Sequence, residues 1–243
     1  RDKIKQLNEK YDEKADSIPV LPDQIKVEEI KEFVKSLDKL PVGIYKDSLN
    51  LAIYNFKSNL VNLISAKNIE VATEYVTHLY EELKLLEDID VTVFDAEGIV
   101  QTASKNIKLD YQNYSLRIQN NISKSKYNVC IIVGIDKFLI NIEKEILSDL
   151  RKAEELKNYT FIVVDSVFKL KNHEYDDWYK AYITKDSGIW VGNGVADQYL
   201  IRMNTSARNL VNNCGESFGY LIKQEEAKLI KLIGMKDAGE KNG

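Results

Sequence analysis

Hydrophobic positions along this chain fall into two alternating patterns, short continuous runs and stripes spaced three or four residues apart. Continuous apolar runs predict strands, and stripes of that spacing predict amphipathic helices. The expected strands are residues 49–56, 60–64, 90–96, 128–136, 160–165 and 188–194, with a terminal hairpin at 218–233. The expected helices are residues 27–40, 69–86, 111–122, 142–156, 175–182 and 197–203.

The alternation of strands and helices predicts the fold class. Short strands that are apolar on both sides need cover on both faces, which is the situation of a parallel sheet between two layers of helices. Residues 160–165, with the sequence TFIVVD, are one such strand. We therefore expect an α/β fold of three layers, with a mostly parallel central sheet and a terminal β-hairpin.

The two ends of the chain lack this strong pattern. Residues 1–17 carry one weak apolar stripe among charges and are predicted to be a helical linker from an upstream domain. The polar residues 237–243 are predicted to be a disordered tail, which leaves residues 18–236 as one domain. Because the chain begins with Arg1 rather than Met, we expect it to be a piece of a longer protein.

Composition and charge narrow the possible partners. The formal net charge is −4 and basic residues are interleaved with acidic ones, so no nucleic-acid partner is expected. The longest apolar run, VCIIVGI, is far shorter than the roughly 20 residues that cross a bilayer. Cys130 and Cys214 have neither metal-ligand spacing nor a disulfide framework, and we expect inert thiols in a reducing cytosol.

The sequence NLVNLISAKNIEVATEYV at residues 59–76 predicts a strand, a loop and a helix, which is the layout of a phosphate-binding P-loop. On the template G-x-x-x-x-G-K-[ST], the glycines fall on Ser65 and Glu70, the lysine on Val71 and the hydroxyl residue on Ala72. Glycines let backbone N–H groups wrap the phosphates, the lysine neutralises their charge, and the Ser or Thr holds Mg²⁺. Each of these functions is removed by its replacement.

Two interpretations of this segment stay open at the level of sequence. It is either a nucleotide site that has lost its chemistry or an ordinary βα turn that never had any. In the first case Lys67, on the loop, would offset part of the charge of Glu70. The residues assigned to the vestigial nucleotide site are Ser65, Lys67, Asn68, Glu70, Val71 and Ala72.

A nucleotide site of this layout also needs an acid at the end of a second strand to order Mg²⁺, usually followed by an acid that activates water. Asp136, at the end of the run 128–136, is the best match, and Lys137 stands where the activating acid would be. A lysine ammonium cannot take that role because it has no acceptor. Asp165 ends the next strand, and for both aspartates simple capping of the following turn is the alternative.

Other residues that could carry chemistry are sparse. Gly192 and Gly194 form a G-x-G that fits a tight turn better than a dinucleotide fingerprint, since the third glycine is missing. His173 is followed by three acids within residues 174–177, but one histidine beside surface acids does not predict a metal site. Because His78 is the only other histidine, we assign no catalytic residue.

Aromatic residues gather in the segment 175–182. Tyr175, Trp178 and Tyr182 are spaced to share one face of a short helix. Exposed aromatic residues are enriched at binding surfaces, so these three are candidates for a partner-binding site. Packing into the core is the alternative for them.

Several of these segments, taken in order, resemble a known family. The chain contains IPVLPDQI, LPVGIYKDSLNLAIYNF, NLVNLISAKN opening a helix, CIIVGID at the second nucleotide strand, and SGIWVGNGVADQ. Together they resemble the FtsK/SpoIIIE-type ATPase domains of EssC, the membrane-bound coupling protein of Gram-positive type VII secretion systems, and in particular the C-terminal one. The resemblance covers Ile18 to Ile233 and implies a RecA-like P-loop NTPase fold.

The resemblance also implies a setting and partners. It implies a cytosolic domain of a cell-membrane protein that works as a homo-hexamer. The implied partners are secreted WXG100-type substrate proteins and other components of the secretion machinery. Asp136 matches the family's motif, whereas Ser65, Glu70, Val71, Ala72 and Lys137 depart from it.

The leading hypothesis is therefore a degenerate ATPase-like domain that acts in substrate recognition and motor assembly rather than ATP hydrolysis. No cofactor is then expected, and ATP with Mg²⁺ would bind only if the altered site were still competent. The alternative is a functional ATPase domain with a non-standard P-loop that powers secretion. A small-molecule α/β enzyme would need a convergent set of acids and bases that the sequence does not show.

Overall fold

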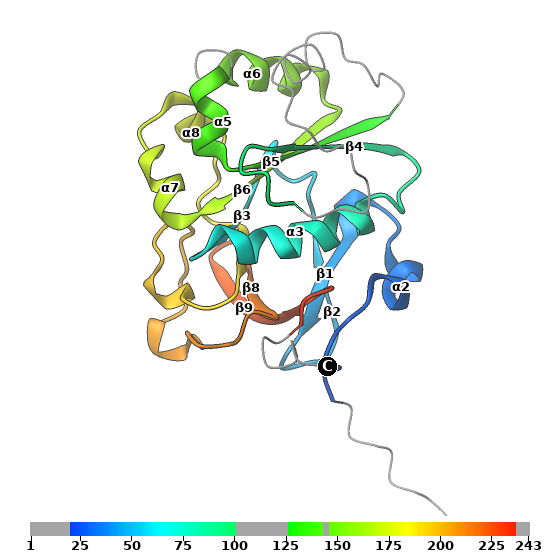
Figure 1. The fold of residues 1–243 in the computed structure, drawn as a ribbon. Coiled ribbons are helices and arrows are strands. Elements are labelled where there is room, and N and C mark those ends of the chain that lie inside the picture. Colours follow the sequence, from blue (N-terminus) through cyan, green and yellow to red (C-terminus); the bar gives the residue numbers. More distant parts are fainter. Residues whose placement is uncertain (1–19, 101–125, 143–145, 237–243) are drawn as a thin grey trace, which may run out of the picture.

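The computed structural model describes residues 20–100, 126–142 and 146–236 (Figure 1). The predicted linker at 1–17, the predicted helix at 111–122 and the predicted tail at 237–243 lie outside the described residues. The strands are β1 (Leu40–Tyr45), β2 (Leu51–Tyr54), β3 (Val61–Ala66), β4 (Ile89–Asp95), β5 (Tyr127–Val133), β6 (Tyr159–Ser166), β7 (Gly188–Val191), β8 (Phe218–Lys223) and β9 (Glu226–Leu232). The helices are α2 (Val27–Ile30), α3 (Ile69–Leu83), α5 (Ile135–Ile142), α6 (Ile146–Leu156), α7 (Val167–Asn172) and α8 (Asp177–Tyr182), with short 3₁₀ turns η1 (Lys31–Phe33), η2 (Leu37–Lys39), η3 (Val195–Asp197) and η4 (Ala207–Asn209).

The described strands form one nine-stranded sheet in the order β2-β1-β9-β8-β7-β3-β6-β5-β4. Strands β7, β3, β6, β5 and β4 pair in parallel, whereas the pairs from β2 to β7 are antiparallel. The sheet is therefore mixed, and the prediction of a mostly parallel sheet is wrong. The α/β class and the terminal hairpin β8–β9 are confirmed. Antiparallel neighbours need no helix between them, so this half of the sheet adds strands without adding layers.

Two apolar clusters lie on the two faces of the sheet. Alternate residues of a strand point to opposite faces, so Val163 of β6 joins one cluster while Ile162 and Val164 join the other. The buried face of α3 packs in the cluster of Ile162, and buried residues of α5, α6, α7 and α8 pack in the cluster of Val163. Figure 1 shows α3 crossing the middle of the view, with α5 to α8 gathered at its upper left. Helices thus cover both faces of the sheet.

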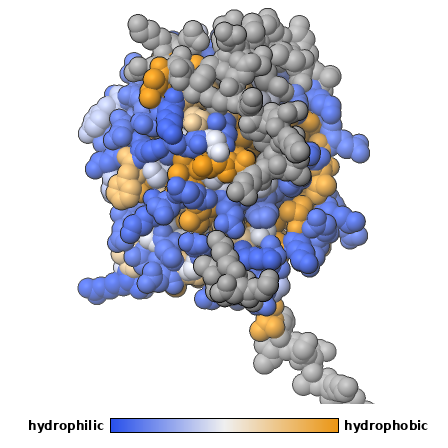
Figure 2. All heavy atoms as spheres, viewed as in Figure 1, coloured by the Kyte–Doolittle hydropathy of each residue, from blue (hydrophilic) through white to orange (hydrophobic). Residues whose placement is uncertain are grey.

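The outer surface contrasts with these clusters. On the side seen in Figure 2, hydrophilic residues predominate and hydrophobic residues show in separate patches. Among the helices of the described residues, none has the length and apolar character needed to cross a bilayer.

The predicted helix at 27–40 is wrong over most of its length. Only Val27–Ile30 is α-helical, and the last predicted residue, Leu40, opens strand β1. Pro41 and Gly43, residue types that commonly follow the end of a helix, lie inside the strand. The proline is tolerated because β1 pairs with β9 only from Gly43 onward, so the missing N–H of Pro41 faces no partner on that side.

The apolar run at 128–136 is a strand only as far as Val133. Gly134 has φ of 75°, a left-handed conformation that glycine adopts without strain, and α5 begins at the next residue. The helix predicted at 142–156 therefore begins too late, because this range holds only the last residue of α5 together with α6. The helix predicted at 197–203 is also wrong, since the turn η3 ends at Asp197.

Candidate functional site

The carboxyl ends of the paired parallel strands β3 and β6 lie side by side, and we call the space outside them the crevice. The helix after β3, α3, covers one face of the sheet, and the helix after β6, α7, covers the other. Neighbouring parallel strands whose helices leave in opposite directions open a crevice, and ligands of α/β proteins bind there. Ser65 pairs with Asp165 at this edge, so these two residues mark its floor.

The connection from β3 to α3 is much shorter than a phosphate loop. Ser65 is still within the strand, the helix starts at Ile69, and only Lys67 and Asn68 lie between. The Ser65 hydroxyl donates a hydrogen bond of 2.9 Å to the backbone carbonyl of Asp165 and is fully buried. With two residues between strand and helix, the connection is too short to wrap a phosphate with the backbone N–H groups of a loop. The loop predicted between the strand at 60–64 and the helix at 69–86 is thus shortened to two residues.

The remaining positions of the template lie in the first turn of α3. Glu70 is exposed, Val71 is half-buried and Ala72 is fully buried in the core. A pocket of about 190 Å³ adjoins the turn and is lined by Ala66, Lys67, Asn68, Val71, Val191, Asn193 and Glu216. Ligand pockets typically hold about 300–1,000 Å³, so this one is small for a nucleotide. Lys67 is nevertheless the cation next to it.

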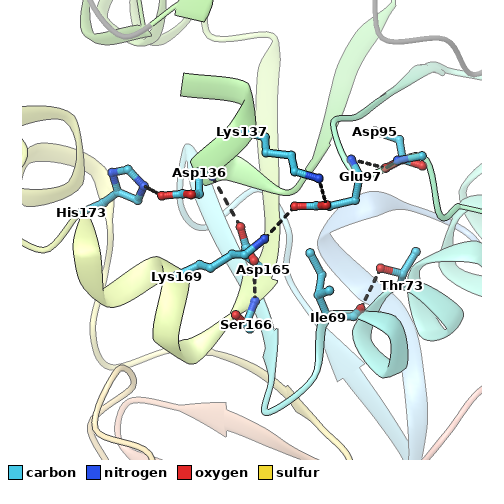
Figure 3. A network of polar contacts seen from close by, with 11 residues as sticks. Ile69, Thr73, Asp95, Glu97, Asp136, Lys137, Asp165, Ser166, Lys169 and His173 are labelled. Atoms are coloured by element: carbon cyan, nitrogen blue, oxygen red, sulfur yellow. Dashed lines mark hydrogen bonds and ion pairs between the residues drawn. The ribbon is translucent and has the colours of Figure 1, made fainter. Parts of the chain in front are cut away.

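The two residues assigned to the second nucleotide strand do not lie at a strand end. Asp136 and Lys137 belong to the first turn of α5, beyond Gly134. The carboxylate of Asp136 lies 3.1 Å from Nε2 of His173 on the loop after α7, so it faces that loop. Lys137 reaches the opposite way, to the carboxylate of Glu97 (Figure 3). The assignment of Asp136 to a strand end is therefore corrected.

Glu97 and Lys169 are central to this crevice and were missed at the sequence level. Figure 3 shows the carboxylate of Glu97 between the ammonium groups of Lys137 and Lys169, beside Asp165. Lys169 Nζ lies 2.7 Å from Oε1 of Glu97, and Lys137 binds Oε2. The available signals were the acid Glu97, two residues after the end of β4, and a lysine four residues after Asp165. Neither signal belongs to a P-loop template, because Glu97, Lys137 and Lys169 come from separate segments of the chain.

Asp165 is the buried acid of the crevice. Its side chain is inaccessible to solvent, and its two oxygens accept hydrogen bonds from the backbone N–H groups of Ser166, at 2.7 Å, and Asp136, at 3.5 Å. Burial raises the pKa of Asp165 to about 6, and these hydrogen bonds together with Lys169 only partly oppose that shift. The carboxyl group of Asp165 therefore ionises at a higher pH than that of an exposed aspartate.

His173 and the residues around it form a hydrogen-bonded cluster rather than a solvated loop. Nδ1 of His173 lies 2.7 Å from the carboxylate of Asp176, which also accepts a hydrogen bond of 3.3 Å from Nε1 of Trp178. Asp136 lies on the other side of the ring. Within the described residues, no group of three or more His, Cys, Asp or Glu side chains is arranged to hold a metal ion.

The three aromatic candidates for partner binding separate in the structure. Trp178 is only 4% exposed and packs in the core, as the alternative interpretation expected. Tyr182 is half-buried and donates a hydrogen bond of 3.0 Å to Glu154, whereas Tyr175 is 76% exposed. Trp178 is thus corrected to a core residue, and only Tyr175 presents most of its ring to a partner.

The remaining sequence assignments concern the thiols and glycines. Cys130 is buried, Cys214 is half-buried, and neither forms a disulfide. Gly192 and Gly194 have φ of 73° and 91°, left-handed conformations that glycine adopts without strain. His78 of α3 is half-buried rather than on the surface, and burial lowers its pKa.

No family model and no curated protein sequence matches the chain. Solved structures do match. A structure titled the cytoplasmic domain of EssC aligns over 96% of this chain and 51% of its own, at 14% identity and a TM-score of 0.65. EssC ATPases 2 and 3 from Geobacillus thermodenitrificans align over 96% and 49%, at 14% identity and a TM-score of 0.64. The fold is that of the EssC and EccC ATPase domains.

A third match with this EssC-like fold carries a ligand. Thermomonospora curvata EccC, ATPases 2 and 3, in complex with a signal sequence peptide, aligns over 96% of this chain and 47% of its own, at 12% identity and a TM-score of 0.63. The chain spans about half the length of these EssC and EccC structures. The likeness therefore applies to one domain-sized part of each.

Proposed function

We propose that this chain is an ATPase-like domain of a type VII secretion translocase that recognises secreted proteins and takes part in motor assembly without hydrolysing ATP. The fold shared with EssC and EccC supports the secretion setting. The signal sequence peptide bound to Thermomonospora curvata EccC supports recognition of secreted proteins as the task. The proposed partners are WXG100-type proteins and other components of the same machinery.

The observation that carries the loss of hydrolysis is the connection between β3 and α3. Lys67 and Asn68 are its only two residues, and neither is a glycine. Phosphate binding at such a junction needs several backbone N–H groups turned toward the anion. The N-terminal turn of α3 instead carries the acid Glu70, which repels a phosphate at the positive end of the helix.

The proposed setting is the cytosolic part of a longer membrane-anchored chain. Its relatives in fold are about twice as long, so further ATPase domains would lie on the same polypeptide. A homo-hexamer would present six copies of a weak recognition surface. Linked copies raise the apparent affinity without new contacts, so each contact can be small.

Calorimetric titration of ATP with Mg²⁺ into the purified chain, together with a phosphate-release assay, tests the loss of hydrolysis. We expect neither binding heat at micromolar nucleotide nor turnover. Lys67 is the residue that favours the opposite outcome, because it is the cation beside the small pocket. Micromolar binding with turnover that disappears in Lys67→Ala would replace this proposal with a working ATPase that uses a non-standard loop.

The proposed recognition surface lies beside α7. Phe168, Tyr175 and Tyr199 are 61%, 76% and 52% exposed. Lys171 Nζ lies 4.7 Å from the ring centre of Tyr199, and Lys180 Nζ lies 5.8 Å from that of Tyr175. Exposed aromatic rings with an ammonium group beside them suit a helical segment that carries an acid next to an apolar side chain.

Binding of a purified WXG100-type protein from the same secretion system tests this surface. We expect Tyr175→Ala and Tyr199→Ala each to weaken binding several-fold. Phe33→Ala is the matched control, because Phe33 is also an exposed aromatic residue, at 53%, but lies in η1 next to α2. Equal binding by all three variants and the unmodified chain would move the recognition site elsewhere.

A further inference from the structure

The crevice between β3 and β6 holds a carboxylate that the chain itself supplies. Glu97 comes from the segment after β4, Lys137 from α5 and Lys169 from α7, so three separate segments converge (Figure 3). Each lysine binds a different oxygen of the Glu97 carboxylate. Such an arrangement, one ammonium group per oxygen, is also one that suits a phosphate group.

The segment that carries Glu97 is fixed by its own hydrogen bonds. The carboxylate of Asp95, at the end of β4, accepts hydrogen bonds from the backbone N–H groups of Glu97 at 3.0 Å, Gly98 at 2.8 Å and Val100 at 2.7 Å. This turn directs the side chain of Glu97 over Gly134. A Cβ atom at Gly134 would lie 2.7 Å from Cγ of Glu97, so the glycine makes room for the glutamate.

The electrostatics keep Glu97 ionised although it is largely covered. Its side chain is 12% exposed, while those of Lys137 and Lys169 are 52% and 35% exposed. Burial opposes ionisation of Glu97, but the hydrogen bonds from Lys137 and Lys169 outweigh it and lower its pKa. The hydrogen bond to Glu97 raises the pKa of Lys169 in turn. Glu97 and Lys169 are therefore both charged at neutral pH.

We propose that Lys137 and Lys169 form a binding site for an oxyanion of the phosphate class, and that Glu97 occupies this site as an internal ligand. A phosphate group enters only when Glu97 withdraws from the two lysines. The neighbouring acid Asp165 accepts hydrogen bonds from the backbone N–H groups of Ser166 and Asp136.

This inference goes beyond the proposed function, because it concerns an anion site on α5 and α7 rather than the connection after β3. An internal ligand competes at high effective concentration, since it is covalently attached. The unmodified chain is therefore expected to bind phosphate groups weakly even though both lysines are in place. Removing the charge of Glu97 exposes the site without altering the connection at Lys67.

The test is calorimetric titration of inorganic pyrophosphate into the whole chain and its variants at fixed ionic strength. We expect Glu97→Gln to bind pyrophosphate at least tenfold more tightly than the unmodified chain. The matched control is Glu74→Gln, which removes one negative charge at an exposed position of α3. Adding Lys169→Met to Glu97→Gln should abolish the gain. If Glu97→Gln binds no more tightly than Glu74→Gln, the proposal is overturned.

A second measurement covers the case in which Glu97→Gln folds poorly. A ligand that binds only the folded state raises its stability, so pyrophosphate should raise the melting temperature of this variant more than potassium chloride of equal ionic strength. If the variant is unfolded in buffer, pyrophosphate should restore its circular dichroism spectrum. Absence of both effects overturns the proposal. The ATP titration of the unmodified chain is a separate measurement, so failure of one proposal does not decide the other.

Discussion

Glu82 provides a sharp test of how burial and charge are balanced in this fold. It lies on the core-facing side of α3, one and two turns after Leu79 and Tyr75, and is only 1% exposed. One of its carboxyl oxygens is buried without a hydrogen-bond partner among the described residues. Burial raises the pKa of Glu82 well above its ordinary value of 4.5, because the charged form is desolvated.

The magnitude follows from the proton balance. In the unfolded chain Glu82 ionises near its ordinary pKa of 4.5, so at pH 7 folding must either take up a proton or bury a charge. Holding the proton costs about 1.4 kcal/mol for each pH unit above the ordinary pKa, which gives a ceiling of about 3 kcal/mol at pH 7. The sign is such that this penalty is absent below pH 4.5 and grows as the pH rises toward the folded-state pKa.

The perturbation is Glu82→Met, which keeps an unbranched side chain of similar length and removes the ionisable group. We expect this variant to be more stable than the unmodified chain by about 1–3 kcal/mol at pH 7, with a smaller gain at pH 5. Urea unfolding followed by circular dichroism at both pH values measures the difference. Glu74→Met, on the exposed side of the same helix, is the control and should change stability by no more than about 0.5 kcal/mol. A gain that is equal at both pH values, or a loss at pH 7, would refute the reasoning.

Three further predictions follow from the same structure. The chemical shift of the Asp165 carboxyl carbon should change with a midpoint near pH 6, and the free energy of unfolding should fall as the pH rises from about 4 to 6. A midpoint near the ordinary pKa of 3.8 would contradict the argument that burial raises the pKa of Asp165. Trp178→Ala should lower the free energy of unfolding, measured with urea, by about 3–5 kcal/mol, whereas Tyr175→Ala should change it by no more than about 0.5 kcal/mol. Similar losses in both variants would contradict the burial of Trp178 and the exposure of Tyr175. Gly134→Ala should lower the free energy of unfolding by about 1–3 kcal/mol, because Gly134 has φ of 75° and a Cβ atom there would collide with Glu97. Glu97→Ala should recover part of that loss in a double-mutant cycle, and strict additivity of the two changes would show that the two side chains do not meet.

The parts of the fold that could be predicted are those with a strong local pattern. Strands β3 and β6 are buried on both faces, so their sequences are mostly apolar, and α3 has a regular stripe of buried residues. Strand β1 could not be predicted in the same way. Its proline and glycine normally mark a boundary, and their place in a strand depends on where β9 begins to pair.

For the candidate site, the sequence predicted only which residues of a phosphate loop are missing. Ser65, Glu70 and Val71 showed from sequence that the groups of a phosphate loop are replaced. The predicted strand at 60–64 and helix at 69–86 already left only a short connection, and the structure reduces it to Lys67 and Asn68. Glu97 and Lys169 lie 72 residues apart, and only the sheet order brings them together.

The core and the crevice are built from separate sets of residues, so the stability of the fold does not depend on the chemistry of the crevice. The two apolar clusters on either side of the sheet supply its hydrophobic stabilisation, and they do not include the charged residues at the carboxyl ends of the strands. Two lysines facing one crevice would repel each other if nothing lay between them. Glu97 supplies the opposite charge, so on our proposal the crevice is stable when no ligand is bound. If recognition takes place at Tyr175 and Tyr199, on the side of α7, as we propose, it would then not depend on nucleotide.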